Sequence, residues 1–196
     1  MNNKEYWDNT WQYRIRDESH VIMNGEKLDV VCSALVFSGY EKLNKVDIGC
    51  GTGIHALRIK HHKPEWVENW TGFDLSESAI EWAKNNGLNA HCVDFTKAQH
   101  KNKYDLFLFL DSLEHIEDEN SLIETIIKSA NDTFIIWGNV PLYKSKHDGG
   151  FEREMDIEKI CSFLKKCGCD KMKNHIYGIQ GYPYMIFEGK GRKKNQ

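Results

Sequence analysis

The sequence contains no run approaching the roughly 20 apolar residues that a membrane-spanning helix requires. Its first residues, Met-Asn-Asn-Lys-Glu-Tyr-Trp, lack the apolar core of a signal peptide. The cysteines show no paired CxxC spacing of the kind that binds zinc. We therefore expect a protein of the reducing cytoplasm, without membrane insertion and without a metal site.

Concentrated positive charge is also missing. The 196 residues carry a net charge of −3, and the one basic run is at Lys190–Lys194. Binding to nucleic acid through phosphates needs clustered Lys and Arg side chains, so we expect no nucleic-acid partner and interpret the run as a solvated tail. With 40% hydrophobic and 12% aromatic residues, the composition is that of a globular chain, and the length suits one domain.

Strand-like and helix-like patterns alternate along most of the chain. Leu28, Val31 and Leu35 repeat at helical spacing, and Gly39 marks where that helix should end. Expected strands follow at 45–48, 70–73, 89–93, 104–110 and 134–137, and expected helices at 53–61, 76–87, 122–127 and 157–168. The fourth strand is a nearly unbroken apolar run, which is typical of a strand buried on both faces, so we place it at the centre of the sheet.

The end of the chain departs from this alternation. Two β-rich segments, around His175–Tyr177 and Tyr184–Glu188, have no helix between them, which favours an antiparallel hairpin. We therefore predict an α/β fold. It is a single Rossmann-like doubly wound sheet of about seven mostly parallel strands, which an antiparallel C-terminal hairpin completes.

The most informative stretch is Val-Asp-Ile-Gly-Cys-Gly-Thr-Gly, which contains Asp47, Cys50 and three glycines at alternate positions, Gly49, Gly51 and Gly53. The glycines allow the backbone to turn tightly and to lie against a ligand, and the helix that follows offers unpaired N–H groups at its start. The carboxylate of Asp47 suits a ligand with a cationic amino group better than one with a pyrophosphate. We interpret Cys50 as a small filler whose backbone, not its thiol, contributes.

Acidic residues follow four successive predicted strands: Asp47, Asp74, Asp94 and Asp111. In an open α/β sheet, ligands bind beyond the carboxyl ends of the strands. A carboxylate has two acceptor oxygens, so Asp74 can accept both ribose hydroxyls of an adenosine, and Asp94 can accept the adenine amino group. Phe95 then lies beside the adenine ring. The alternative role of a strand-end Asp is to cap a helix or to form a turn.

Taken in order, these motifs resemble the class I S-adenosylmethionine-dependent methyltransferases. The matching segments are Val46–Gly53, Gly72–Ser76, Val93–Phe95 and Tyr104–Ile116, the last with a Leu-Glu-His-Ile signature that is similar to the small-molecule enzymes of the quinone-biosynthesis type. The likeness covers residues 44–138 well and the rest only in pattern. It departs from the family where Thr96–Lys103 leaves little room for a helix between the third and fourth strands, which leaves the covering of the adenine edge open.

The resemblance implies that S-adenosylmethionine is the methyl donor, that S-adenosylhomocysteine is the product, and that the acceptor is a small molecule. It also implies cofactor contacts by Leu75, Asp111 and Ser112, in addition to Asp47 and the loop. We expect one domain, 1–196, with an N-terminal helical cap at 1–40 and a cofactor-binding core at 44–138. Residues 139–196 then supply an acceptor loop, a helix and the hairpin.

Methyl transfer is an in-line displacement, for which an enzyme mainly supplies proximity and orientation. If the acceptor is a hydroxyl, a general base helps, and imidazole titrates near neutrality. His115, just beyond the fourth strand, and His147, in a glycine-bearing loop after the fifth, are the candidates. A packing or capping role for His115 stays open at this point.

Aromatic residues near the N-terminus, among them Trp7 and Trp11, suit a lid because their faces attract the cationic sulfonium. The alternative is a hydrophobic anchor that packs the first helix onto the sheet.

Two other functions remain open, and a third is disfavoured. Gly51-Thr-Gly-Ile-His-Ala56 satisfies the dinucleotide pattern G-x-G-x-x-A, so an NAD(P)-dependent oxidoreductase is one alternative. A non-catalytic partner subunit that keeps the cofactor pocket is another. Methylation of nucleic acid is disfavoured because Asp111-Ser-Leu-Glu replaces the Asn/Asp-Pro-Pro-aromatic element expected after the fourth strand. The sequence leaves open the acceptor, the choice of O-, N- or C-methylation, and the oligomeric state.

Overall fold

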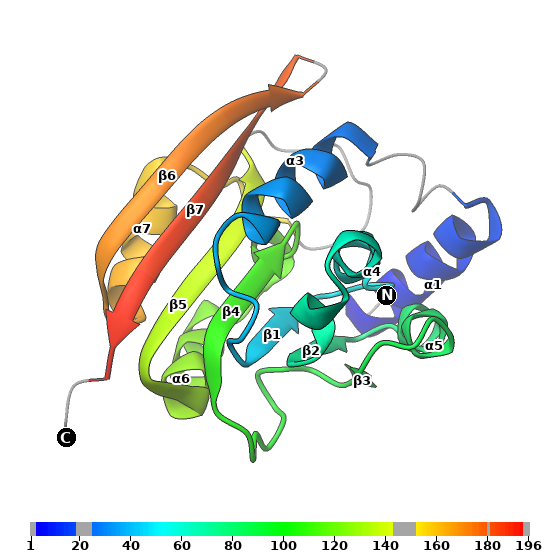
Figure 1. The fold of residues 1–196 in the computed structure, drawn as a ribbon, viewed down its shortest axis with the longest axis horizontal. Coiled ribbons are helices and arrows are strands. Elements are labelled where there is room, and N and C mark those ends of the chain that lie inside the picture. The colour runs from blue at the N-terminus through cyan, green and yellow to red at the C-terminus, as the bar shows by residue number, and fades with distance from the viewer. Residues whose placement is uncertain (1–2, 19–24, 143–151, 180, 194–196) are drawn as a thin grey trace.

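Seven strands form one sheet in the order β3-β2-β1-β4-β5-β7-β6 (Figure 1). The computed structural model describes residues 3–18, 25–142, 152–179 and 181–193. The strands are β1 (Lys45–Ile48), β2 (Trp70–Asp74), β3 (Ala90–Cys92), β4 (Tyr104–Leu110), β5 (Ala130–Pro141), β6 (Cys169–Ile179) and β7 (Tyr182–Arg192). The first five strands run parallel to one another, whereas β7 is antiparallel to both β5 and β6. The predicted fold is therefore confirmed, and β4 lies at the centre of the sheet.

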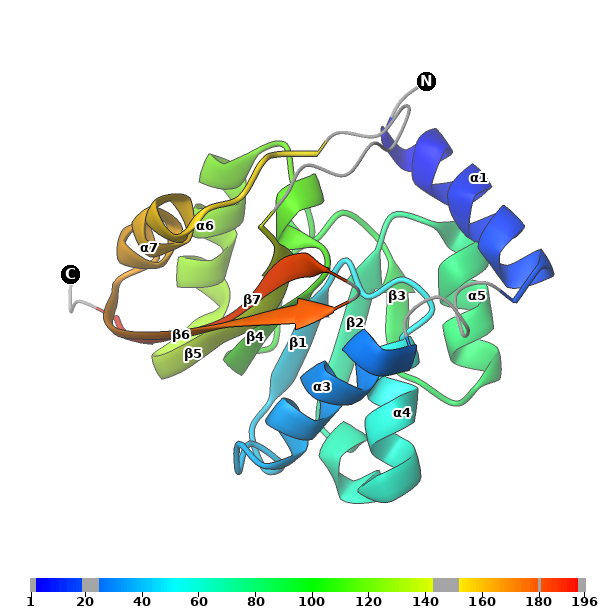
Figure 2. The ribbon, with the colours of Figure 1, turned by 90° about the horizontal axis from the view of Figure 1, so that it is seen from above.

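Helices cover both faces of the sheet (Figure 2). They are α1 (Asn3–Arg16), α3 (Gly25–Val36), α4 (Ile54–His62), α5 (Glu77–Asn85), α6 (Glu119–Ser129) and α7 (Ile157–Lys166), with short 3₁₀ helices η1 (Pro64–Val67) and η2 (Leu113–His115). Buried side chains of α6 and α7 share one core with β4, β5 and β7, while α3, α4 and α5 share a second core on the opposite face. The alternating side chains of β4 join the two cores, with Phe107 and Phe109 on one side and Leu106 and Leu108 on the other.

Side-chain caps explain where three helices begin. Ser76 accepts a hydrogen bond from a backbone N–H in the first turn of α5, as its sequence position predicts. Asp118 and Asp156 do the same for α6 and α7. Two residues of the predicted apolar stripes, Ile127 and Ile157, are instead 38% and 41% exposed. Each residue advances a helix by about 100°, so Ile127, the neighbour of the fully buried Ile126, turns away from the core, whereas Ile157 is the first residue of α7.

Between β3 and β4 the chain forms no helix, as the short stretch there suggests. The rings of Phe95 and His100 lie 4.2 Å apart between centroids, and Phe95 meets Phe73 of β2 at 5.6 Å. These three rings cover the sheet where a helix is missing.

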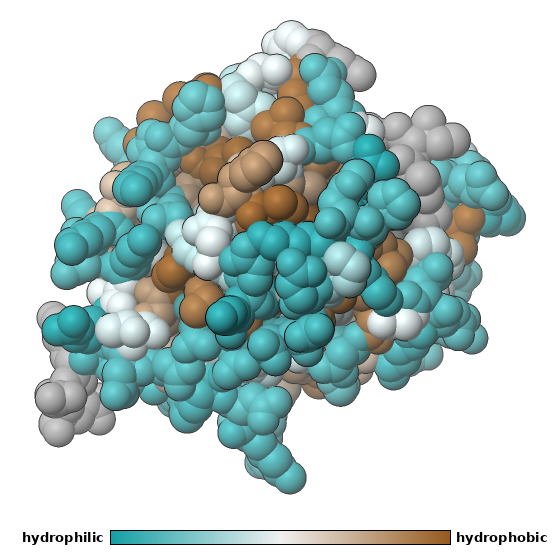
Figure 3. Space-filling view, viewed as in Figure 1, coloured by the Kyte–Doolittle hydropathy of each residue, from teal (hydrophilic) through white to brown (hydrophobic). Residues whose placement is uncertain are grey.

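Among the described residues, no helix combines the length and apolar character that crossing a bilayer demands. Figure 3 shows that hydrophilic side chains predominate on the face drawn there. Exposed large hydrophobics are few among the described residues, and Phe37, at the end of α3, is the most exposed of them at 87%.

Candidate functional site

The glycine loop between β1 and α4 turns through three residues with positive φ: Gly49 at 74°, Gly51 at 54° and Gly53 at 70°. L-residues rarely adopt this conformation, which explains the choice of glycine. The backbone N–H groups of Gly49 and Cys50 donate to the carbonyl of Phe73 at 2.8 and 3.0 Å, so the loop is anchored on β2. A side chain on Gly49 would place its Cβ 2.6 Å from the Ser112 Cβ. The loop is therefore packed directly against the segment that follows β4.

Asp47 lies beneath this loop, at 1% exposure. Its Oδ1 has no hydrogen-bond partner among the described residues, and neither has the buried Oγ1 of Thr52. Burial raises the pKa of Asp47 to about 8, although the neighbouring Trp70 indole acts in the opposite direction. A buried acceptor without a partner is costly, so this position suits a ligand that brings a cationic donor.

Asp74 joins the loop to the start of α5. Its Oδ2 accepts the Gly51 N–H at 2.8 Å and its Oδ1 accepts the Ser76 N–H at 2.9 Å. Burial raises the pKa of Asp74, and these two hydrogen bonds oppose the shift. Each oxygen keeps a further lone pair, so the carboxylate can also accept a ligand hydroxyl. Leu75, which follows, is half-buried.

Asp94 and Phe95 follow β3 at the same edge of the sheet. Asp94 Oδ1 accepts the Thr96 N–H at 2.9 Å and the Thr96 hydroxyl at 2.7 Å, while Oδ2 pairs with Lys97 at 2.9 Å. Burial acts to raise the pKa of Asp94, but the hydrogen bonds from Lys97 and Thr96 bring it below its ordinary value. Phe95 is 3% exposed and packs inward. In this state Asp94 forms a turn, and its adenine contact stays a prediction.

The segment after β4 connects the loop to the rest of the site. The Ser112 hydroxyl donates to the carbonyl of Ile48 at 2.5 Å. Asp111 has a φ of 56°, one of two positive values among the described residues other than glycine. Its Oδ1 pairs with Lys27 Nζ of α3 at 2.7 Å and accepts the amide of Asn139 in β5 at 2.7 Å. Strained backbone at such a position is typical of functional sites.

Helix α1 lies alongside α5 in both views (Figures 1 and 2). Asp8 fixes it there, because Asp8 Oδ1 accepts the Ser78 N–H at 3.0 Å and the Ser76 hydroxyl at 2.8 Å. The Trp11 ring consequently lies against Gly51, where an added Cβ would come within 2.3 Å of it. The Trp7 ring meets the His115 ring edge-on at 4.7 Å. Helix α1 therefore covers both the loop and His115, and its role as a lid stays a prediction.

Of the two predicted histidines, the structure describes only His115, since His147 lies outside the described residues. His115 ends η2, and its Nε2 is 3.9 Å from Glu114 Oε1. Glu114 is 2% exposed, and burial, reinforced by the charge of Asp111, raises its pKa to about 8. Its Oε2 has no partner among the described residues.

Four polar residues at this edge were not predicted from the sequence: Lys27, His55, Asn139 and Tyr177. Asn139 of β5 pairs in register with Leu110, the last residue of β4, so it lies level with the end of that strand. In the sequence it stands two residues after the expected fifth strand, 134–137, which was a signal. Lys27, His55 and Tyr177 come from α3, α4 and β6, and no local pattern marks them.

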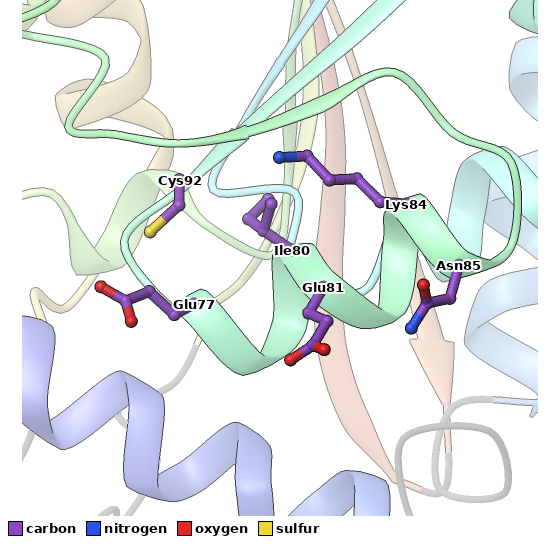
Figure 4. Close-up of a pocket in the computed structure, with 6 residues that line it drawn as sticks. All are labelled: Glu77, Ile80, Glu81, Lys84, Asn85 and Cys92. Atoms are coloured by element: carbon purple, nitrogen blue, oxygen red, sulfur yellow. The ribbon is translucent and has the colours of Figure 1, made fainter.

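A depression on the surface lies between α5 and β3 (Figure 4). Its lining residues are Glu77, Ile80, Glu81, Lys84, Asn85 and Cys92. None of them is among the predicted site residues, and acidic and basic side chains are mixed there. Among the described residues, no group of three or more His, Cys, Asp and Glu side chains is placed to hold a metal ion.

Sequence comparisons identify methyltransferases as relatives of this chain. Residues 26–167 match the methyltransferase domain family. The ubiquinone biosynthesis O-methyltransferase of Hydrogenovibrio crunogenus is 28% identical over 139 residues, 66% of this chain and 54% of that protein. The release factor glutamine methyltransferase of Streptococcus pneumoniae is 28% identical over 111 residues, 54% of this chain and 39% of that protein. The chain thus spans about half or less of the length of these curated relatives.

A solved structure shows the same fold over nearly the whole chain. Magnesium protoporphyrin IX methyltransferase from Synechocystis, crystallised with bound S-adenosylhomocysteine, superposes with a TM-score of 0.72. The alignment covers 96% of this chain and 97% of that one, at 18% sequence identity. At this identity the likeness is one of fold.

Proposed function

This chain belongs to the class I S-adenosylmethionine-dependent methyltransferases, and on that premise we propose that it methylates a small-molecule acceptor at an oxygen or nitrogen atom. One observation carries the proposal. The glycine loop, with φ positive at all three glycines, lies over Asp47, whose buried Oδ1 lacks a partner among the described residues. An unsatisfied acceptor at that point fits the ammonium of an amino-acid arm better than a pyrophosphate.

The residues present fit the cofactor in three places. Asp47 would hold the ammonium, directly or through water, and Asp74 would accept the ribose hydroxyls with the lone pairs that Gly51 leaves free. Asp94 would accept the adenine amino group beside Phe95. Bound S-adenosylmethionine would supply a methyl group activated by the sulfonium charge.

The chain contributes cover and orientation. Trp11 over Gly51 and Trp7 over His115 exclude water from the edge of the sheet, and their faces favour a cationic ligand. Asp8 keeps α1 in this position through the start of α5. Holding the reacting groups in one geometry is the main source of rate in a displacement of this kind.

We assign the general base for a hydroxyl acceptor to His115. It ends η2 next to the buried Glu114, whose carboxyl can orient the imidazole. A positioned imidazole accepts a proton near neutral pH. His147, in the loop that follows β5, remains the second candidate.

We also propose that the protein works in the reducing cytoplasm. All six cysteines are free, and four of them are buried. The division into an N-terminal cap, a cofactor core and a C-terminal acceptor region is part of the same proposal.

The test is calorimetric titration of S-adenosylhomocysteine into the full chain. We expect micromolar binding, its loss in Asp74→Ala, and unchanged binding in Asp29→Ala. Asp29 is the matched control because its carboxylate, 55% exposed, pairs with Arg58 on the surface.

Each other outcome contradicts part of the proposal. Binding of NADH in competition with S-adenosylhomocysteine would indicate an oxidoreductase. Tight binding without turnover on any acceptor, restored only by a second protein, would indicate a non-catalytic partner subunit. Absence of S-adenosylhomocysteine binding would overturn the proposed cofactor.

A further inference from the structure

A cluster of polar side chains lies at the carboxyl edge of the sheet, on the α3 face. Its centre is Asp111, whose Oδ1 contacts both Lys27 and Asn139 at 2.7 Å. Lys27 Nζ also lies 4.6 Å from the ring centroid of Tyr184. Tyr184 stacks on Tyr177 at 5.8 Å between centroids, in the last pairs of the β6–β7 hairpin.

Three buried atoms of the cluster lack partners among the described residues: His55 Nε2, Asn139 Oδ1 and the Tyr177 hydroxyl. His55 is 7% exposed and Asn139 fully buried. A carboxylate only accepts, so the Asn139 amide nitrogen must face Asp111 and its Oδ1 must face elsewhere. Buried polar groups are normally satisfied, so unsatisfied groups gathered at one place indicate a ligand.

The two charged members of the cluster, Lys27 and Asp111, balance each other. Lys27 and Asp111 form an ion pair with side chains only 14% and 21% exposed. Burial lowers the pKa of His55 to about 4, with Lys27 also acting to lower it, so the imidazole is neutral. Lys27 repels an ammonium that Asp111 attracts, and Asp111 repels a carboxylate that Lys27 attracts, so the ion pair offers no net attraction to either charge.

The cluster also adjoins the cofactor loop. Ser112, the residue after Asp111, is bonded to the Ile48 carbonyl and lies against Gly49. A ligand in the cluster is therefore next to the proposed methyl donor. The Asp111 carboxylate itself contacts Lys27 and Asn139.

Resting on the proposed methyl transfer, the geometry points to this cluster as the acceptor subsite, and to an uncharged acceptor that presents hydroxyl groups, from an alcohol or a phenol. One hydroxyl donates to the Asp111 carboxylate, and a second donates to Asn139 Oδ1, a buried oxygen without a partner among the described residues. Asp111 positions the first hydroxyl; when that hydroxyl ionises, its proton passes to the general base, His115, and the electron pair stays on oxygen beside the Lys27 ammonium. Lys27 thus stabilises the oxyanion that forms.

The test uses the full chain saturated with S-adenosylhomocysteine and four probes in saturation-transfer NMR: catechol, methyl α-glucoside, benzylamine and benzoate. We expect transfer to catechol or the glucoside and none to the charged probes. Catechol alone indicates a phenol, and the glucoside alone indicates an alcohol. Preferred binding of benzylamine or benzoate, or no transfer to either hydroxyl probe, would overturn the inference.

Variants separate the subsite from the fold and from the cofactor site. Lys27→Met leaves the Asp111 charge uncompensated, so binding of the hydroxyl probe should fall about tenfold and benzylamine should begin to bind. Tyr177→Phe keeps the ring and should weaken the hydroxyl probe about fivefold, the scale of one hydrogen bond. Lys128→Met, at a surface lysine that is 76% exposed, is the matched control and should change nothing.

S-adenosylhomocysteine affinity should stay constant in all three variants. A parallel loss of S-adenosylhomocysteine and probe binding in Lys27→Met would refute a separate acceptor subsite. Probe failure with normal S-adenosylhomocysteine binding refutes this inference alone, and lack of S-adenosylhomocysteine binding refutes the proposed function as well.

Discussion

Replacing Gly49 by alanine tests how the glycine loop depends on the segment after β4. Gly49 has a φ of 74°, and a Cβ there would lie 2.6 Å from the Ser112 Cβ. That atom is attached directly to the backbone, and the Ser112 hydroxyl is bonded to the Ile48 carbonyl, so no rotation of the side chain can make room. One of the two segments must move.

The magnitude follows from two contributions. An L-residue in the left-handed region costs about 1 kcal/mol, and overpacking adds about 1–3 kcal/mol, so Gly49→Ala should lower the free energy of unfolding by about 2–4 kcal/mol. Gly39→Ala is the matched control, because Gly39 has a φ of 78° and no atom within 4 Å of the added Cβ. It should lose about 1 kcal/mol, from backbone strain alone.

The assay is urea unfolding followed by tryptophan fluorescence, together with S-adenosylhomocysteine titration. Adding Ser112→Gly removes the clashing Cβ, so the double variant should be more stable than the sum of the two single changes predicts, by about 1 kcal/mol or more. Equal losses for Gly49→Ala and Gly39→Ala, or additive effects in the double variant, would refute the reasoning.

Three further predictions follow from the contacts. Asp8→Asn should weaken S-adenosylhomocysteine binding, because it loosens α1. The Ser78 N–H lowers the pKa of Asp8 from 3.8 to about 2. The difference in binding between wild type and variant should therefore be complete above pH 3.8 and disappear as pH falls through about 2. Ser76→Ala should lower the free energy of unfolding by about 1 kcal/mol in a urea titration, because α5 loses its cap; no change would contradict the capping role. Burial raises the pKa of Asp47 to about 8, so its carboxyl is mostly protonated at pH 7 and must ionise to pair with the ligand ammonium. Titration of S-adenosylhomocysteine in buffers of different ionisation enthalpy should therefore show the release of close to one proton. The Asp47→Asn variant should show no such release.

Much of the fold could be read from local pattern. The apolar run at Tyr104–Leu110 predicted a strand buried on both faces, and β4 is the central strand with both cores packed on it. Ser76 predicted the start of α5 because a cap acts within one turn of its own residue. The predicted apolar stripes were wrong at Ile127 and Ile157, because hydrophobicity alone does not show which apolar residues of a helix face the core.

The sequence by itself determined the glycine loop, the acidic strand ends and the parallel sheet with its hairpin, because turn conformation and hydrophobic period are properties of a few adjacent residues. Tertiary structure alone brought Lys27, His55, Asn139 and Tyr177 around Asp111, from four elements far apart in the chain. It also decided that Trp11 covers Gly51, through an Asp8 contact with α5 seventy residues away. Burial, ion pairing and unsatisfied hydrogen bonds depend on which elements pack together, and that information is not local.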